Sequence, residues 1–258
     1  MPIHDSLENR IALVTGAGAG LGAAIARRLS ADGATVVVSD IDYAAAQYVA
    51  DSIERAVAIA ADVTDEDQVR SLVEQTVDRF GALHIAVPNA GVGAVQPIAE
   101  MSYADWRKIT AVDLDGVFLT IRYAAPAIAA SGGGAIVTIS SITATAGSAL
   151  IAPYAASKAA VKNLTETAAV EFRDHGVRVN AVLPGFIDTE LVTTARPHFE
   201  AALGLPAGGF DDLIASKQGR YGTPEEVAAA VAFFASSESS WCTGSSLVLD
   251  GGLVASLF

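Results

Sequence analysis

The chain has 258 residues, of which 52% are hydrophobic and 17% charged, and its formal net charge is −13. This balance provides enough apolar residues for a large core and excludes a disordered chain. The acidic surface disfavours nucleic acid as a partner, and the single cysteine excludes an internal disulfide.

Short apolar runs alternate with longer alanine-rich stretches along the whole chain. The runs predict buried strands at residues 11–15, 35–39, 56–60, 83–87, 135–140, 178–183 and 246–249. The stretches predict helices at residues 21–31, 65–80, 105–130, 154–174 and 224–235. This alternation indicates βαβ units. We therefore expect a single α/β domain over residues 1–258, a doubly wound Rossmann fold whose seven-stranded parallel sheet has helices on both faces.

The first predicted strand leads directly into a glycine-rich turn, Thr15-Gly16-Ala17-Gly18-Ala19-Gly20-Leu21-Gly22. Glycines at such a junction let the backbone approach a pyrophosphate, and the start of the following helix supplies unbonded N–H groups. The second predicted strand ends at Asp40, 18 residues after Gly22. A carboxylate there accepts hydrogen bonds from the adenosine ribose and repels a 2′-phosphate. Since Ile41 and Asp42 add no positive charge, we expect NAD rather than NADP.

Residues 123–157 contain no charged side chain, a length that resembles a membrane span. Three consecutive glycines at residues 132–134, two prolines and a Ser/Thr cluster interrupt it, whereas a spanning helix needs ~20 predominantly apolar residues. We expect a buried strand flanked by loops. The first ten residues lack the basic and apolar regions of an export signal, so the expected location is the cytoplasm.

Tyr154 and Lys158 are four residues apart in a predicted helix, so their side chains share one face. A phenol has a pKa of ~10 and is a poor base at neutral pH, but a neighbouring cation favours the phenolate. Ser141 comes 13 residues before Tyr154, just past the uncharged strand, where open α/β sheets bind ligands. Its hydroxyl is suited to hydrogen-bond a substrate carbonyl oxygen.

Residues 186–219 break the rhythm of the chain, because they carry helical fragments and no strand signal. A connection of this length inside a compact domain is typical of a lid, and we expect a substrate-binding lid insertion here. Its apolar side chains favour a hydrophobic, cyclic or aryl-alkyl substrate; they are Leu191, Val192, Phe199, Leu203, Leu205 and Phe210.

These motifs together resemble those of the short-chain dehydrogenase/reductase family, over about residues 10–252. The matching residues are Thr15 to Gly22, Asp40, Asp62-Val63, Asn89-Ala90-Gly91, Ser141, Tyr154 with Lys158, Asn180, Pro184-Gly185, Thr243-Gly244 and Asp250-Gly251-Gly252. The resemblance implies an NAD-dependent oxidoreductase that interconverts a secondary alcohol and a ketone by hydride transfer.

The resemblance also implies a role for each matching residue. Tyr154 is the implied general acid/base, Lys158 assists it and holds the nicotinamide ribose, and Ser141 orients the substrate oxygen. The implied cofactor-binding residues are Gly16, Gly18, Gly20, Leu21, Gly22, Asp40, Ile41, Asp62, Val63, Asn89, Ala90, Gly91, Tyr154, Lys158, Pro184, Gly185, Ile187 and Thr189. The expected substrate-binding residues are Ser141, Thr143, Tyr154, Val192 and Phe199.

Three positions depart from the family pattern. Asp113 replaces an asparagine whose backbone carbonyl holds a water of the proton relay. We hypothesise that Asp113 keeps this catalytic role through its own backbone, although its side chain competes for the charge of Lys158 or is kept protonated. Pro88 removes one backbone donor, so local strand pairing must differ. His84 replaces a frequent aspartate, and we expect it on the surface at the entrance of a strand.

Two other functions remain open. A 3-oxoacyl-thioester reductase acting on an acyl-carrier-protein or CoA substrate is disfavoured by Asp40 and by the acidic charge. A catalytically impaired NAD-binding protein is suggested only by Asp113. The four histidines lack metal-ligand spacing, so we expect no metal site.

The family resemblance also suggests how the chain associates. It implies a homotetramer, in which the long helices and the C-terminal strand pack across two-fold axes. Residues 253–258, Leu-Val-Ala-Ser-Leu-Phe, are apolar enough to contact a partner surface. The expected partners are therefore other copies of the chain and a small alcohol or ketone, with neither nucleic acid nor membrane among them.

Overall fold

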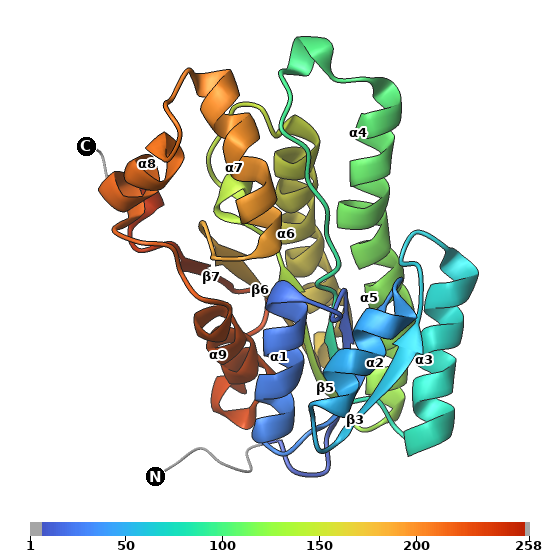
Figure 1. The fold of residues 1–258 in the computed structure, drawn as a ribbon. Coiled ribbons are helices and arrows are strands. Elements are labelled where there is room, and N and C mark those ends of the chain that lie inside the picture. Colours follow the sequence, from blue (N-terminus) through green and yellow to red (C-terminus); the bar gives the residue numbers. More distant parts are fainter. Residues whose placement is uncertain (1–6, 256–258) are drawn as a thin grey trace.

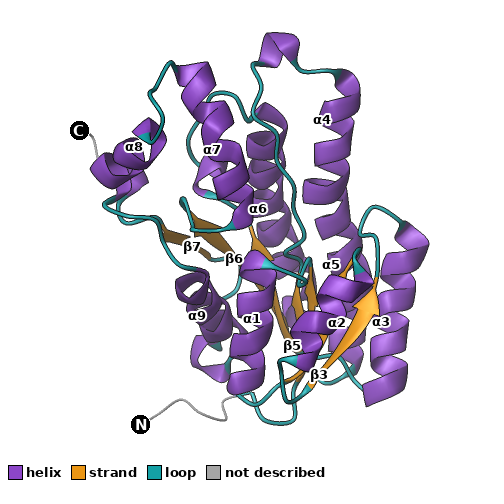
Figure 2. Cartoon of the chain, viewed as in Figure 1, coloured by secondary structure: helices purple, strands orange, loops and turns teal. Residues whose placement is uncertain are grey.

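A computed structural model describes residues 7–255, and its centre is one seven-stranded sheet (Figures 1 and 2). Every pair of neighbouring strands is parallel, in the spatial order β3-β2-β1-β4-β5-β6-β7. The strands are β1 (Ile11–Thr15), β2 (Thr35–Asp40), β3 (Ala56–Ala60), β4 (Ile85–Val87), β5 (Gly134–Ile139), β6 (Val177–Pro184) and β7 (Ser246–Leu249). The predicted fold class is therefore confirmed.

The strand order changes direction between β1 and β4. From β1 the chain continues outward through β2 and β3, and β4 then returns to the other side of β1. Loops that leave the carboxyl ends of β1 and β4 diverge, which opens a crevice at this edge of the sheet. Of the 18 residues predicted to bind cofactor, eight follow these two strand ends: Gly16, Gly18, Gly20, Leu21 and Gly22 after β1, and Asn89, Ala90 and Gly91 after β4.

Helices cover both faces of the sheet. On one face lie α1 (Gly20–Ala31), α2 (Tyr43–Asp51) and α9 (Pro224–Ala235), whose buried residues share a core cluster. On the other face lie α3 (Glu66–Phe80), α5 (Gly116–Ala130) and α6 (Ala152–Phe172), which form a second cluster. The α2 helix was not predicted. Its start depends on Asp42, whose carboxylate accepts hydrogen bonds from the backbone N–H groups of Ala44 and Ala45.

The single helix predicted at residues 105–130 is interrupted. The structure has α4 (Tyr103–Thr110), a π-helical turn over Ala111–Asp115 and then α5. A π turn inserts one extra residue and thereby redirects side chains, and such turns are frequent at functional sites. Here the turn carries Asp113, whose side chain is completely buried.

The surroundings of β4 differ from the prediction. The strand begins at Ile85 rather than Leu83, because the Leu83 N–H donates to the Ser131 hydroxyl and not to a neighbouring strand. His84 is not simply a surface residue: its Nδ1 accepts a hydrogen bond from the Ile11 N–H at 3.1 Å. Burial, and then the nearby Arg10 charge, lowers the pKa of His84. Pro88 contributes only its carbonyl, which accepts from the Ile139 N–H at 3.4 Å.

Residues 186–219 form two helices beyond the carboxyl edge of the sheet, α7 (Glu190–Leu203) and α8 (Gly209–Gln218) (Figure 1). Three aromatic rings hold this segment together: Phe210 stacks on Phe199 at 4.9 Å between centroids and meets Phe186 edge-on at 5.4 Å. Between residues 7 and 255, no helix has both the length and the apolarity to cross a membrane. Of the apolar C-terminal residues 253–258, residues 256–258 lie outside the described part of the chain.

Candidate active site

The glycine-rich turn lies between the end of β1 and the start of α1. Gly16 and Gly20 have φ angles of +60° and +52°, which residues other than glycine rarely adopt. A Cβ on Gly22 would come within 2.2 Å of the Gly16 carbonyl oxygen, so this position also excludes a side chain. The N-cap residue Ala19 offers no side-chain acceptor to the first N–H groups of α1. These donors fit the pyrophosphate of a dinucleotide.

Asp40 connects the end of β2 to the same turn. Its Oδ2 accepts a hydrogen bond from the Gly18 N–H at 2.9 Å, and its Oδ1 accepts from the Asp42 N–H at 3.1 Å. Each oxygen retains a second lone pair, so the carboxylate is held in place and can still accept from a ligand. Ile41 beside it is 70% exposed.

The predicted residues that follow β3 and β4 reach the turn from the other side. The Asn89 side-chain amide donates to the carbonyl oxygens of Thr15 and Gly16 at 2.9 and 3.0 Å. Val63 is buried and packs with Ala90. The Asp62 carboxylate accepts from the N–H and hydroxyl groups of Thr64. Asn89 therefore locks the glycine turn against the loop after β4, which also carries Gly91.

Tyr154 and Lys158 lie side by side as their helical spacing predicted, and Ser141 lines the same cavity as Tyr154. Ser141 is buried after β5, and its Oγ accepts from the Thr143 N–H at 3.2 Å, so the hydroxyl proton is left for another acceptor. Tyr154 lies in the first turn of α6, and Lys158 follows one turn later. The Lys158 Nζ lies 5.3 Å from the centre of the Tyr154 ring and donates to the Ile139 carbonyl at 3.2 Å.

Asp113 is completely buried beside Lys158. Its Oδ1 accepts from the Val92 N–H at 2.8 Å, whereas its Oδ2 has no hydrogen-bond partner and lies 3.8 Å from the Lys158 Nζ. Burial raises the pKa of the Asp113 carboxyl, and the charge of Lys158 opposes this rise. The structure thus brings the Asp113 side chain into contact range of Lys158.

The residues after β6 include the last group that was predicted to bind cofactor. Gly185 follows Pro184, where a Cβ would meet the Gln218 side chain at 2.5 Å. Ile187 is buried and pairs with Gly222 in a short parallel bridge. The methyl group of Thr189 faces the glycine turn: a Cβ on Gly20 would lie 4.0 Å from it. The start of the lid segment is therefore placed opposite the glycine-rich turn.

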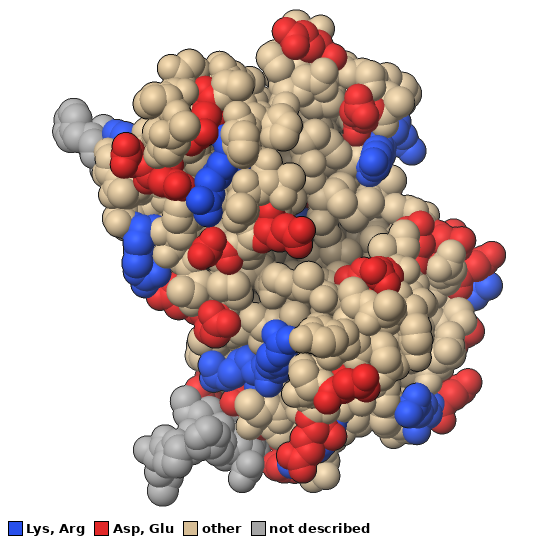
Figure 3. Space-filling view, in the orientation of Figure 1, with Lys and Arg blue, Asp and Glu red and all other residues tan. Residues whose placement is uncertain are grey.

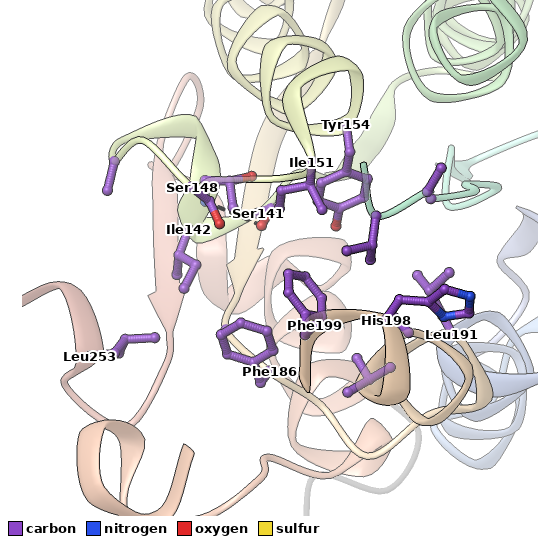
Figure 4. A pocket seen from close by; sticks show the side chains of 18 of the residues that line it. Ser141, Ile142, Ser148, Ile151, Tyr154, Phe186, Leu191, His198, Phe199 and Leu253 are labelled. Carbon is purple, nitrogen blue, oxygen red and sulfur yellow. Dashed lines mark hydrogen bonds between the residues drawn. The ribbon is translucent and has the colours of Figure 1, made fainter. Parts of the chain in front are cut away.

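A cavity of about 770 Å³ opens between Ser141, Tyr154 and the lid segment. Figure 4 shows the Ser141 and Tyr154 hydroxyls directed into it, with Phe186 and Phe199 on the opposite side. All five predicted substrate-binding residues line it. The lining residues outside the predicted motifs and the predicted substrate-binding set lie mostly in loops, with Thr194 and Ala195 on α7. They are Gly93, Ala94, Val95, Ile142, Ala146, Gly147, Ser148, Ile151, Phe186, Thr194, Ala195, Leu253 and Val254.

The lining of this cavity is mostly apolar and carries no carboxylate, lysine or arginine. Tyr154 and His198 are its titratable residues, and the Thr143 hydroxyl is a buried polar group without a partner. Figure 3 shows the molecule hollowed beside the lid, with acidic side chains on both sides of the hollow. Among residues 7–255, no three His, Cys, Asp or Glu side chains are grouped to hold a metal ion.

The known proteins that resemble this chain are named as dehydrogenases and reductases. A family model described as enoyl-(acyl carrier protein) reductase matches residues 16–254. The cis-4-hydroxycyclohexanecarboxylate dehydrogenase of Sinomonas cyclohexanicum is 42% identical and covers 97% of this chain and 99% of its own. The cyclohexanol dehydrogenase of Acinetobacter sp. (strain SE19) is also 42% identical, with 96% of each chain covered.

A solved structure also resembles this chain over nearly its whole length. A short-chain type dehydrogenase/reductase from Mycobacterium marinum superimposes with a TM-score of 0.88 at 37% sequence identity. The superposition covers 97% of each chain, so the lid segment and the site are included along with the sheet.

Proposed function

Because this chain belongs to the short-chain dehydrogenase/reductase family and is an oxidoreductase acting on CH–OH groups, we propose that it oxidises a hydrophobic cyclic or aryl-alkyl secondary alcohol with NAD. The observation that carries the proposal is a largely apolar cavity lined by Ser141 and Tyr154, with the buried Lys158 beside Tyr154. The names of the two cyclohexane-ring dehydrogenases support a ring-shaped substrate.

The preference for NAD rests on Asp40. Its carboxylate is held at the end of β2 by two backbone N–H groups, and no lysine or arginine replaces it in the adjoining residues 41 and 42. A negative charge there accepts hydrogen bonds from ribose hydroxyls and repels a 2′-phosphate. A nicotinamide cofactor is common to the family, and Asp40 supports the non-phosphorylated form.

Each catalytic side chain has a separate task. Tyr154 takes the proton of the substrate hydroxyl, and the Ser141 hydroxyl donates to the same oxygen, which orients the carbinol carbon. Lys158 supplies positive charge beside Tyr154 and a donor for the ribose. The nicotinamide, when bound, accepts the hydride. We assign Asp113 to the proton relay through its backbone carbonyl.

The remaining predicted residues would hold the cofactor. The glycine turn from Gly16 to Gly22 would take the pyrophosphate, and Asp62 and Val63 would flank the adenine. Asn89, Ala90 and Gly91 would line the trough. The segment from Pro184 and Gly185 to Ile187 and Thr189 would face the nicotinamide carboxamide. Residues 186–219 would close over the substrate as a lid.

One second candidate function comes from the family model, whose description refers to an acyl carrier protein. A 3-oxoacyl-thioester substrate carries phosphates or an acidic protein, which basic side chains usually contact. The lysines and arginines of this chain lie outside the cavity lining, so the alcohol is favoured. A catalytically impaired NAD-binding protein is disfavoured by the intact arrangement of Ser141, Tyr154 and Lys158.

We also propose a homotetramer located in the cytoplasm. Exposed apolar side chains on the two long helices support association: Phe118 on α5 is 45% exposed and Val170 on α6 is 65% exposed. The described residues Leu253–Ala255, at the end of the chain, add a further apolar surface.

The first experiment measures reduced-nicotinamide absorbance with NAD and with NADP over a panel of alcohols. The panel contains cyclic, aryl-alkyl, steroid and 3-hydroxyacyl-thioester substrates. We expect turnover with NAD on the cyclic or aryl-alkyl class. Turnover confined to the thioester, or to NADP, would contradict the proposal.

The matching variant is Tyr154→Phe. It should lose at least ~10³-fold in turnover while calorimetry shows unchanged NAD affinity, because only the proton acceptor is removed. The control Tyr48→Phe removes a hydroxyl from an exposed residue on α2 and should keep full activity. Retained activity in Tyr154→Phe would remove Tyr154 from the proposed role.

A further inference from the structure

The proposed mechanism uses the backbone carbonyl of Asp113 and gives no role to its buried side-chain carboxyl. The side chain has no exposed surface, and its Oδ2 lacks any hydrogen-bond partner. That oxygen faces the Lys158 ammonium at 3.8 Å. A completely buried carboxyl with one unsatisfied oxygen is uncommon, because it costs free energy unless a charge or donor compensates it.

The surroundings make Lys158 the compensating charge. The π turn that carries Asp113 packs against α4, α5 and α6. Asp115 in the same turn and Arg107 and Lys108 on α4 are exposed, and the charged residue of α5, Arg122, is more than half exposed beside Glu66. Of the charged residues of α6, only Lys158 is buried, whereas Lys162 and Glu166 pair with each other nearer the surface.

The same ammonium serves Tyr154. The Lys158 Nζ lies 5.3 Å from the centre of the Tyr154 ring. Besides Tyr154, the titratable residue that lines the cavity is His198, which is exposed on α7. A negative charge beside Lys158 weakens the positive potential that the lysine exerts on the phenol, and poor solvent screening in the interior makes this effect larger than at the surface.

We propose that Asp113 is a positioning residue whose carboxylate holds Lys158 and offsets its charge, so that Tyr154 accepts the substrate proton only at a higher pH than the lysine alone would allow. This inference rests on the proposed function and concerns the regulation of the same site. An asparagine in this place would occupy the same volume without the charge, and its Oδ1 would still accept from the Val92 N–H.

The test compares Asp113→Asn with the wild-type enzyme across pH. We expect the acid limb of the profile of kcat for alcohol oxidation to move to lower pH by about one unit, which is up to about tenfold more turnover on that limb. The plateau at high pH should change less than about twofold, because the relay carbonyl is retained. The control Asp115→Asn changes the net charge equally at an exposed position and should leave the profile unmoved.

A second readout needs neither substrate nor cofactor. The tyrosinate absorbance that depends on Tyr154 is obtained as the difference between each protein and its Tyr154→Phe counterpart. It should develop at lower pH in Asp113→Asn than in the wild type. Coincident titrations, or a shift to higher pH, would overturn the inference. If the wild type oxidises no alcohol in the panel, the proposed function fails, and this titration still decides the role of Asp113.

Loss of folding is checked separately. Circular dichroism and thermal melting of Asp113→Asn should match the wild type. If that variant does not fold, Asp113→Ser provides a smaller neutral side chain for the same two titrations. The same shift in Asp113→Ser supports the charge effect, and its absence there contradicts it.

Discussion

Asp40 has a structural role in addition to its proposed role in cofactor recognition. Its two oxygens accept from the Gly18 and Asp42 N–H groups, so the carboxylate helps to shape the glycine-rich turn. The position at the end of β2 was predictable from the spacing to Gly22. The hydrogen bond to Gly18 was not, because it joins residues 22 apart in the sequence that meet only when β1 and β2 pair.

Replacing Asp40 by serine should change the choice of cofactor. We expect the ratio of kcat/KM for NAD over NADP to fall at least ~10-fold, since the repulsion of a 2′-phosphate disappears and a charged ribose acceptor is lost. Steady-state kinetics with both cofactors measure this. The control Asp51→Ser removes a charge at the far end of α2 and should leave the ratio unchanged, and an unchanged ratio in Asp40→Ser would remove Asp40 from cofactor selection.

At the scale of elements, the lid segment depends on a small aromatic core. Phe210 is 3% exposed, and its ring contacts Phe199 on α7 and Phe186 after β6. Phe186 and Phe199 also line the substrate cavity, whereas Phe210 supports them from behind. The packing of α7 on α8 therefore positions one wall of the cavity.

Truncation of Phe210 should loosen that wall. In Phe210→Ala, loss of the buried ring costs about 3–5 kcal/mol locally, enough to favour opening of α7 and α8 over a closed lid. We expect KM for the preferred alcohol to rise roughly tenfold and limited trypsin digestion to accelerate at Lys217. Phe210→Leu, which keeps much of the volume, is the matched control. Unchanged KM in Phe210→Ala would show that the lid wall does not contribute to substrate binding.

For the whole molecule, net charge and apolar surface have opposite effects on association. A charge of −13 makes copies repel one another, whereas the exposed apolar residues of α5 and α6 favour contact. A two-fold axis places the same patch of two copies together, so an apolar stripe along a long helix is self-complementary.

Light scattering tests the proposed assembly. We expect a mass about four times 26.3 kDa for the wild type and a smaller mass for Val170→Asp, because a buried carboxylate at the helix contact is unfavourable. Tyr48→Asp introduces the same charge on exposed α2 and should leave the assembly intact. A wild-type mass near 26 kDa would contradict the tetramer.

Local patterns predicted much of the fold and site. The alternation of apolar runs and alanine-rich stretches predicted seven strands and the parallel sheet, because buried strands and helices have different lengths and periods. Helical spacing predicted that Tyr154 and Lys158 share one face of a helix. The position of the glycine turn between a strand and a helix predicted its conformation. These features depend on residues near one another in the chain, so the sequence by itself determined them.

Only the tertiary structure decided the contacts between distant segments. The π turn places Asp113 beside Lys158, 45 residues later, and the cavity wall combines loops after β4, β5 and β6 with the lid. Helix α2, nine residues long, escaped prediction because a short alanine-rich run gains its stability from packing on β2 and β3. The physical reason in each case is burial. Residues from distant parts of the chain decide which polar group is left unpaired and which apolar face is covered, and the local sequence does not contain those residues.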